Sequence, residues 1–194
     1  RDNSWAVLID YIITYIGSKG KITTKNKPFP LLYEEIFVEA VKNKGFNELQ
    51  LKEFIANETR KLSFNIVHKE IVNTGIINIL TTNYDLTFES QFIDNISNLK
   101  NDGYVKESTY SIFRNYKLGS TNIWHLHGDC NYPNSITLGY EHYSGYLQQM
   151  RNYVTTGTGN SYKDLKLEPL TKRLKNGLKQ NYSWLDFFFT KDIY

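Results

Sequence analysis

The stretch ILTTNYDLTFE, residues 79–89, decides which kind of fold this chain adopts. It continues an apolar, β-branched run, which is typical of a short strand buried on both faces. The run then breaks into two threonines and Asn-Tyr-Asp before helical spacing of apolar residues begins. The sequence therefore predicts a strand at 75–82 that turns at Asn83 into a helix over 85–96, with Asp85 as its N-cap.

A second stretch, NIWHLHGD at 122–129, breaks in the same way. It predicts a strand that ends at His127, with Gly128 allowing a sharp turn behind it. Ligands of open α/β sheets lie at the carboxyl ends of the strands, where the loops and the helix N-termini meet. Asn83 and His127 are therefore candidates for one shared site. The alternative is that TTNYD is only a well-capped turn, and this possibility stays open.

The remaining sequence alternates helical patterns with short strand patterns, which indicates an α/β fold with a parallel sheet. Residues 155–164 are polar and glycine-containing, and they predict a flexible loop that could close over a site. The predicted helices cover residues 4–17, 31–43, 47–61, 62–74 and 140–154, and further strands are predicted near 110–116, at 135–139 and from 187 onward.

The bulk composition is that of a water-soluble globular chain with one domain. The 194 residues are 40% hydrophobic and 22% charged, and no segment reaches the ~18 apolar residues that a membrane span needs. A net charge of +3 with scattered lysines argues against direct nucleic-acid binding. The single cysteine excludes internal disulfides and a four-cysteine zinc module, and it favours a reducing, cytoplasmic compartment.

Taken together, TTNYDLTFE and HLHG resemble motifs of the bacterial sirtuin-like NAD-consuming domains, which are distant relatives of the sirtuin deacylases. The deacylases carry a Thr-Gln-Asn-Ile-Asp turn and a His-Gly turn at the corresponding places. The resemblance implies that Asn83 orients the nicotinamide ribose and a water molecule. It implies that Asp85 helps to hold the nicotinamide end and that His127 is the catalytic base.

Three neighbouring residues complete the set that the resemblance places beside NAD. Thr82 stands where the deacylases have Gln, Tyr84 stands where they have Ile, and Gly128 follows the catalytic histidine. We expect all three to contact the dinucleotide.

The resemblance extends to both ends of the chain. SWAVLIDYI at 4–12 resembles the tryptophan-containing helix after the family's phosphate loop, and SWLDFFFTKDIY at 183–194 resembles the lead into a later strand. The Gly-Ala-Gly-x-Ser loop itself would lie before Arg1, and the later strand would begin at Asp192. We therefore expect residues 1–194 to be one truncated domain, a Rossmann-like three-layer parallel sheet.

A helical insertion at 20–75 is expected in place of the zinc ribbon of the deacylases, whose cysteines are missing here. That absence argues against protein deacylation and for plain NAD cleavage. The predicted activity is an NAD glycohydrolase that produces nicotinamide and ADP-ribose, with NAD as its substrate and no metal. The resemblance implies a bacterial anti-phage effector with a fused or separate sensor domain, and we expect it to form a homo-oligomer.

Two other functions remain open from the sequence. His125 and His127 lie on one face of a strand, as in hydrolases whose metal is bound by a His-x-His motif. The further donors fall short, because Cys130 stands where such hydrolases carry a histidine. We expect His125 instead to be partly buried and bonded to the backbone. The other alternative is a non-catalytic module that binds a nucleotide and acts as a sensor.

Overall fold

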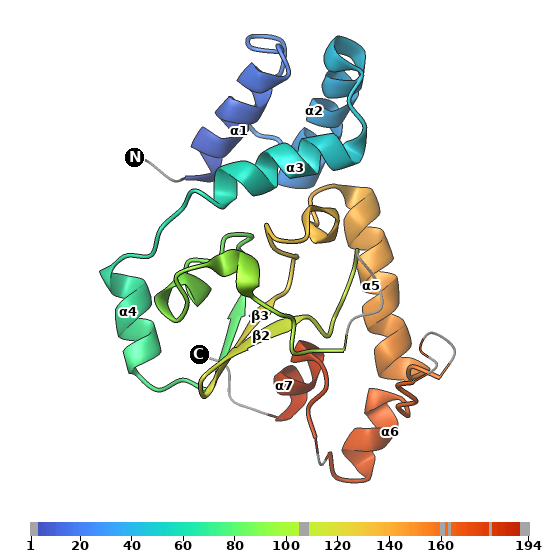
Figure 1. The fold of residues 1–194 in the computed structure, drawn as a ribbon. Helices are drawn as coiled ribbons and strands as arrows, with labels where there is room; N and C mark the ends of the chain where they lie inside the picture. Colours follow the sequence, from blue (N-terminus) through green and yellow to red (C-terminus); the bar gives the residue numbers. More distant parts are fainter. Residues whose placement is uncertain (1–3, 105–108, 160–161, 163, 179, 191–194) are drawn as a thin grey trace.

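The computed structural model describes residues 4–104, 109–159, 162, 164–178 and 180–190 (Figure 1). Among these residues, no helix combines the length and the apolar character that a membrane crossing requires. In chain order the elements are α1 Trp5–Tyr15, α2 Phe29–Lys44, α3 Glu48–Thr59, α4 Ile66–Asn73, β1 Asn78–Thr81, the 3₁₀ turns η1 Glu89–Gln91 and η2 Ile96–Asn98, β2 Asn115–Leu118, β3 Thr121–His125, the 3₁₀ turn η3 Pro133–Ser135, α5 Tyr140–Thr155, α6 Leu170–Lys175 and α7 Trp184–Thr190.

A three-stranded sheet with the order β1-β3-β2 forms the centre of the described fold. The strands β1 and β3 are parallel, whereas β2 and β3 are antiparallel and are joined by a two-residue turn with Gly119 at φ +61°. The α/β class is thus confirmed, but the expectation of a wholly parallel sheet is wrong for β2. The three-layer Rossmann arrangement stays a prediction.

Helices α1, α2 and α3 form a layer beyond one end of the sheet, and the arrow of β1 points toward them (Figure 1). Their shared core is largely aliphatic and includes the fully buried Ile16, Ile36, Leu51 and Ile55. A capping box in which Asn47 and Gln50 bond each other's backbone starts α3. Residues 20–75 contain α2, α3 and α4 and no strand, and their status as an insertion stays a prediction.

A second core lies on the side of α5, α6 and α7 and is largely aromatic. It includes Phe113, Trp124, Tyr153 and Trp184. Asp186 of α7 is fully buried within reach of this core, where it accepts hydrogen bonds from the Tyr153 hydroxyl and from backbone N–H groups. The C-terminal helices are therefore held to α5 by a polar network as well as by apolar packing.

Three predicted elements are wrong. The helix expected over 85–96 is replaced by η1 and η2, because the Asp85 carboxylate bonds the backbone and hydroxyl of Thr87 and forms a turn. The strand expected at 135–139 is a 3₁₀ turn followed by a loop. The strand expected from residue 187 is helical as far as Thr190, and the remainder lies outside the described residues.

Other predictions are confirmed within a few residues. Helices occur where the sequence predicts them at 4–17, 31–43, 47–61 and 140–154, and the helix predicted at 62–74 is the shorter α4. The strand predicted near 110–116 lies slightly later, as β2. Part of the loop predicted at 155–164 lies outside the described residues.

Candidate functional site

The turns that contain Asn83 and His127 lie side by side because the strands before them are paired. Thr81 of β1 and His125 of β3 are partners in the parallel register. The backbone N–H of Leu126 then donates to the carbonyl of Thr81 at 2.9 Å. Asn83 and His127 each follow two residues after these partners. The expected pairing of the two strands that precede them is confirmed, and a site shared by both side chains stays a prediction.

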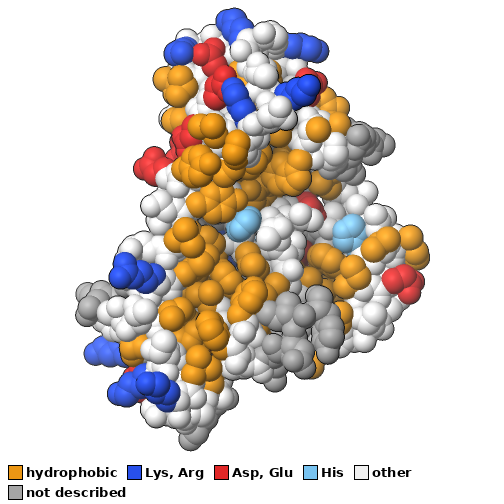
Figure 2. Space-filling model, turned by 180° about the vertical axis from the view of Figure 1, so that it is seen from behind, with side chains coloured by type: hydrophobic (Ala, Val, Ile, Leu, Met, Phe, Trp, Pro, Cys, Tyr) orange, Lys and Arg blue, Asp and Glu red, His pale blue; other side chains and the backbone are white. Residues whose placement is uncertain are grey.

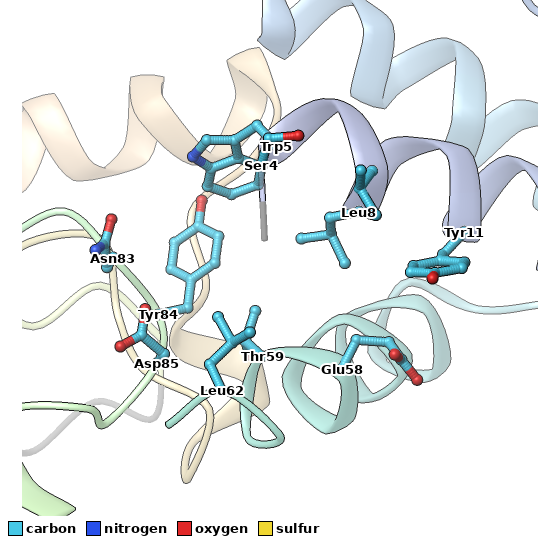
Figure 3. Close-up of a pocket in the computed structure, with 11 residues that line it drawn as sticks. Ser4, Trp5, Leu8, Tyr11, Glu58, Thr59, Leu62, Asn83, Tyr84 and Asp85 are labelled. Atoms are coloured by element: carbon cyan, nitrogen blue, oxygen red, sulfur yellow. The ribbon is translucent and has the colours of Figure 1, made fainter. Parts of the chain in front are cut away.

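A cavity of about 230 Å³ lies between α1, α3 and the turn that follows β1 (Figure 3). Its walls are mainly apolar and aromatic, and carboxylates come from opposite sides of it. Trp5 meets the ring of Tyr84 edge-on at 5.5 Å between centroids. The lining residues are Ser4, Trp5, Val7, Leu8, Tyr11, Glu58, Thr59, Leu62, Asn83, Tyr84 and Asp85.

Both backbone groups of Asn83 are held, while its side chain is exposed at the cavity. The backbone N–H donates to the Thr81 hydroxyl at 3.1 Å. The carbonyl oxygen lies 2.9 Å from Nδ1 of His125. The carboxamide is therefore the part of Asn83 that is presented to a ligand.

Tyr84 connects the turn after β1 with the loop after β3. Its side chain is buried, and its hydroxyl donates to the carbonyl of Thr137 at 2.7 Å. The N–H of Thr137 in turn donates to the carbonyl of His127 at 2.9 Å. Burial raises the pKa of the Tyr84 hydroxyl well above its usual value, so it remains a donor throughout the physiological range. Tyr84 thus lines the cavity and also supports the loop after β3.

His127 is half-buried in the turn after β3, and its ring meets Tyr143 of α5 edge-on at 5.4 Å. Burial lowers the pKa of His127 below its usual value of 6.5, so the imidazole is neutral at pH 7 and can accept a proton. The residues that line the cavity beside Asn83 do not include His127. The structure thus places His127 in the turn after β3, outside that cavity, and the predicted strand ends two residues earlier than expected, at His125.

The other predicted site residues have distinct surroundings. Gly128 has φ +85°, and a Cβ there would lie 2.2 Å from the Ser135 carbonyl oxygen, which confirms the predicted sharp turn. Thr82 is exposed and does not line the cavity. Asp85 lines the cavity while its Oδ1 accepts hydrogen bonds from Thr87, so it caps a turn and not the predicted helix.

His125 is more deeply buried than expected, with 2% of its surface exposed. It does bond the backbone, at Asn83, as predicted from the sequence. Its second partner is Glu89, whose Oε1 lies 2.7 Å from Nε2, and this contact was not predicted. Glu89 falls in the helix that the sequence wrongly predicted, and no spacing pattern relates residues 36 positions apart.

These bonds bear on the metal-site alternative. Both ring nitrogens of His125 are engaged by protein atoms, so this histidine could bind a metal only by breaking one of those bonds. Within the part of the chain that the structure describes, no three His, Cys, Asp or Glu side chains are grouped as metal ligands.

Comparison with known proteins supplies the family. A family model described as a SIR2-like domain matches residues 77–179, which is more than half of the 194 residues. No curated protein and no solved structure matches the chain. The matched range includes β1, the Asn83 turn, β3 and His127. On this match, the chain belongs to the family of SIR2-like domains.

Proposed function

We propose that this domain cleaves the bond between nicotinamide and ribose in NAD and transfers the ribose to water. Proteins of the SIR2-like family are NAD-dependent enzymes, which supports NAD as the substrate. The observation that carries the proposal is the position of Asn83 and His127, each two residues beyond paired positions of parallel strands. An amide and a neutral imidazole at one edge of a sheet are the groups that this reaction requires.

The reaction needs positioning more than strong acids or bases. The C1′–N bond breaks with its electron pair moving to the pyridinium nitrogen, so nicotinamide leaves as a neutral molecule. Water then bonds to C1′ and loses a proton. Asn83 can hold a ribose hydroxyl and the attacking water without adding charge. The neutral His127 can accept the proton at pH 7.

The cavity beside Asn83 fits the nicotinamide end of the substrate. Pockets for drug-sized ligands occupy about 300–1,000 Å³, so a space of 230 Å³ suits part of a dinucleotide and not the whole. The nicotinamide ring of NAD is cationic and planar. Aromatic rings from Trp5 and Tyr84 and carboxylates from Glu58 and Asp85 are complementary to such a ring.

Thr82 directly follows β1, and Gly128 lies three residues after the end of β3. We place both beside the remaining part of the dinucleotide. We further propose that the enzyme acts in bacterial anti-phage defence as a cytoplasmic homo-oligomer, under the control of a fused or separate sensor. These biological roles rest on the sequence resemblance alone.

One structural observation favours a second function. Because His127 does not line the cavity, the domain could bind the nucleotide without turning it over and serve as a sensor. Detection of product separates the two functions.

The test uses the full-length protein that contains this domain, together with its activator, and measures nicotinamide and ADP-ribose by chromatography. Wild type is expected to release both in equal amounts. Asn83→Ala and His127→Ala are each expected to lower kcat by about 100-fold or more. Matched controls are Asn73→Ala on the exposed end of α4 and His68→Ala at the start of that helix, which should retain activity.

The outcomes separate the functions cleanly. Intact NAD in the presence of bound nucleotide would support the sensor function. Normal cleavage by Asn83→Ala would show that the assigned site is wrong.

A further inference from the structure

We propose that His125 and Glu89 are positioning residues, which fix the Asn83 backbone so that its carboxamide meets the ribose in one orientation. This inference rests on the proposed function, because it assigns a role through Asn83. His125 does not line the cavity and so is not placed in contact with the substrate.

Asn83 needs an additional restraint because β1 ends before it. Thr81 is the last residue of β1, and its carbonyl accepts the Leu126 N–H. The next backbone–backbone hydrogen bond between the two segments runs from the Cys130 N–H to the carbonyl of Tyr84. Asn83 lies between these two bonds, where the regular ladder no longer holds its carbonyl. The His125 ring supplies the missing donor from the adjacent strand.

The peptide units on both sides of Asn83 are thereby fixed by side chains. Thr81 accepts from the N–H and His125 bonds the carbonyl, at 3.1 Å and 2.9 Å. Rotation about the backbone of Asn83 would break one of these bonds. Such restraint keeps a catalytic amide in the geometry that the reaction needs, and small displacements of such groups cost rate and not only affinity.

The charges around His125 favour the doubly protonated ring. Glu89 of η1 bonds Nε2, and Asp129 follows β3 nearby, while Tyr116 of β2 meets the ring edge-on at 5.9 Å. Burial lowers the pKa of His125, but the carboxylates of Glu89 and Asp129 and the Asn83 carbonyl outweigh it and raise the pKa to about 9.

The consequence is a fixed hydrogen-bond direction. At neutral pH both ring nitrogens carry hydrogen, so Nδ1 donates to the Asn83 carbonyl while Nε2 donates to Glu89. A neutral ring would have a single N–H and could serve only one of these two acceptors. The buried ion pair thus keeps the Asn83 contact formed over the whole neutral range.

The experiment compares three variants in the full-length protein with its activator. His125→Leu removes both bonds, His125→Asn keeps an amide donor near the position of Nδ1, and Glu89→Gln keeps an acceptor for Nε2 without the charge. His125→Leu is expected to lower kcat for NAD cleavage by about 10- to 100-fold with little change in KM. His125→Asn is expected to recover most of that loss.

The pH profile gives a readout that a purely structural role would not move. Wild-type kcat should fall as the pH rises through about 9, when His125 loses a proton. In Glu89→Gln this fall should begin at lower pH, and in His125→Asn it should be absent. The matched control is His142→Asn, because His142 is also buried, bonds backbone N–H groups and contacts Glu48, away from Asn83.

The possible failures are distinguishable. An inactive wild type, or full activity in Asn83→Ala, would overturn the proposed function and this inference with it. An inactive Asn83→Ala with His125→Leu no worse than His142→Asn would overturn the positioning role alone. If His125→Leu does not fold, an unchanged alkaline limb in Glu89→Gln and His125→Asn would overturn it equally.

Discussion

At the scale of single residues, two independent features require a glycine at position 128. Its φ of +85° lies in the region that favours glycine, and a side chain would collide with the backbone of Ser135. Gly119 has φ +61° but open space around it, so it provides a comparison in which only the backbone conformation matters.

We predict that Gly128→Ala lowers the free energy of unfolding by at least about 2 kcal/mol, because steric overlap adds to the strain of a positive φ. Gly119→Ala should cost about 1 kcal/mol, from strain alone. Urea unfolding of both variants measures the difference. Equal losses would show that the Ser135 backbone moves aside at little cost.

The protonation of His127 makes a second prediction at this scale. A catalytic base must be neutral, and burial lowers the pKa of this histidine below 6.5. NAD cleavage should therefore be constant near pH 7, and on the acid side it should fall as the pH drops through this lowered pKa. A profile of kcat/KM against pH measures it. An acid limb centred above 6.5 would contradict the assignment of His127 as the base.

The raised pKa of His125 makes a prediction about stability, in which the loss occurs on the alkaline side. Its folded pKa of about 9 exceeds the usual 6.5, so its contribution is fully present below about pH 6.5 and is lost as the pH rises through about 9. The free energy of unfolding should decrease over this window in wild type, and the decrease should be smaller in His125→Asn. Identical pH dependence in both proteins would mean that the pair does not titrate as the structure indicates.

At the scale of elements, Asp186 links α7 to the rest of the domain. This fully buried carboxylate accepts from the Tyr153 hydroxyl on α5 and is paired with Arg173 of α6 at 3.2 Å. Removing one member of a buried charged network leaves the other without compensation.

Asp186→Ala should therefore lower the free energy of unfolding by about 3–5 kcal/mol. Glu168→Ala, which removes a carboxylate from the surface pair with Lys172, should cost less than about 1 kcal/mol. Thermal and urea unfolding test both. Similar small losses in the two variants would show that the network does not hold the C-terminal helices.

The elements also show what the sequence can and cannot predict. Apolar periodicity located α1, α2, α3 and α5, because a helix that packs on a core must repeat every 3.6 residues. The same pattern at 85–96 predicted a helix that does not form, because the Asp85 side chain bonds locally and stops it. The direction of β2 was missed because alternation reveals a strand but not the orientation of its partner.

The candidate site could likewise be predicted only in part from the sequence. Asn83 and His127 were proposed because polar residues and glycine interrupt apolar strands, and the parallel pairing of β1 and β3 agrees with that proposal. The contact between His125 and Glu89 could not be predicted, because it depends on tertiary packing across 36 residues. The cavity beside Asn83 could likewise not be predicted from the sequence, because α1 and α3 form its other walls.

At the scale of the whole molecule, α1, the end of α3 and the turn after β1 line the cavity together, so segments far apart in the sequence contribute to it (Figure 3). Hydrophobic side chains also gather in a broad band on one face of the molecule (Figure 2). Several large apolar side chains are exposed, among them Ile77 at 61% and Phe189 at 57%. Such surfaces are compatible with the homo-oligomer that we propose.

The central claim is that Asn83 and His127 act on the same ribose, and a double-mutant cycle tests it most directly. The quantity measured is kcat for nicotinamide release by wild type, Asn83→Ala, His127→Ala and the double variant. Groups that work as one unit are strongly non-additive, so the double variant should be little slower than the slower single variant. If the two losses multiply instead, the residues act independently, and the shared site is contradicted.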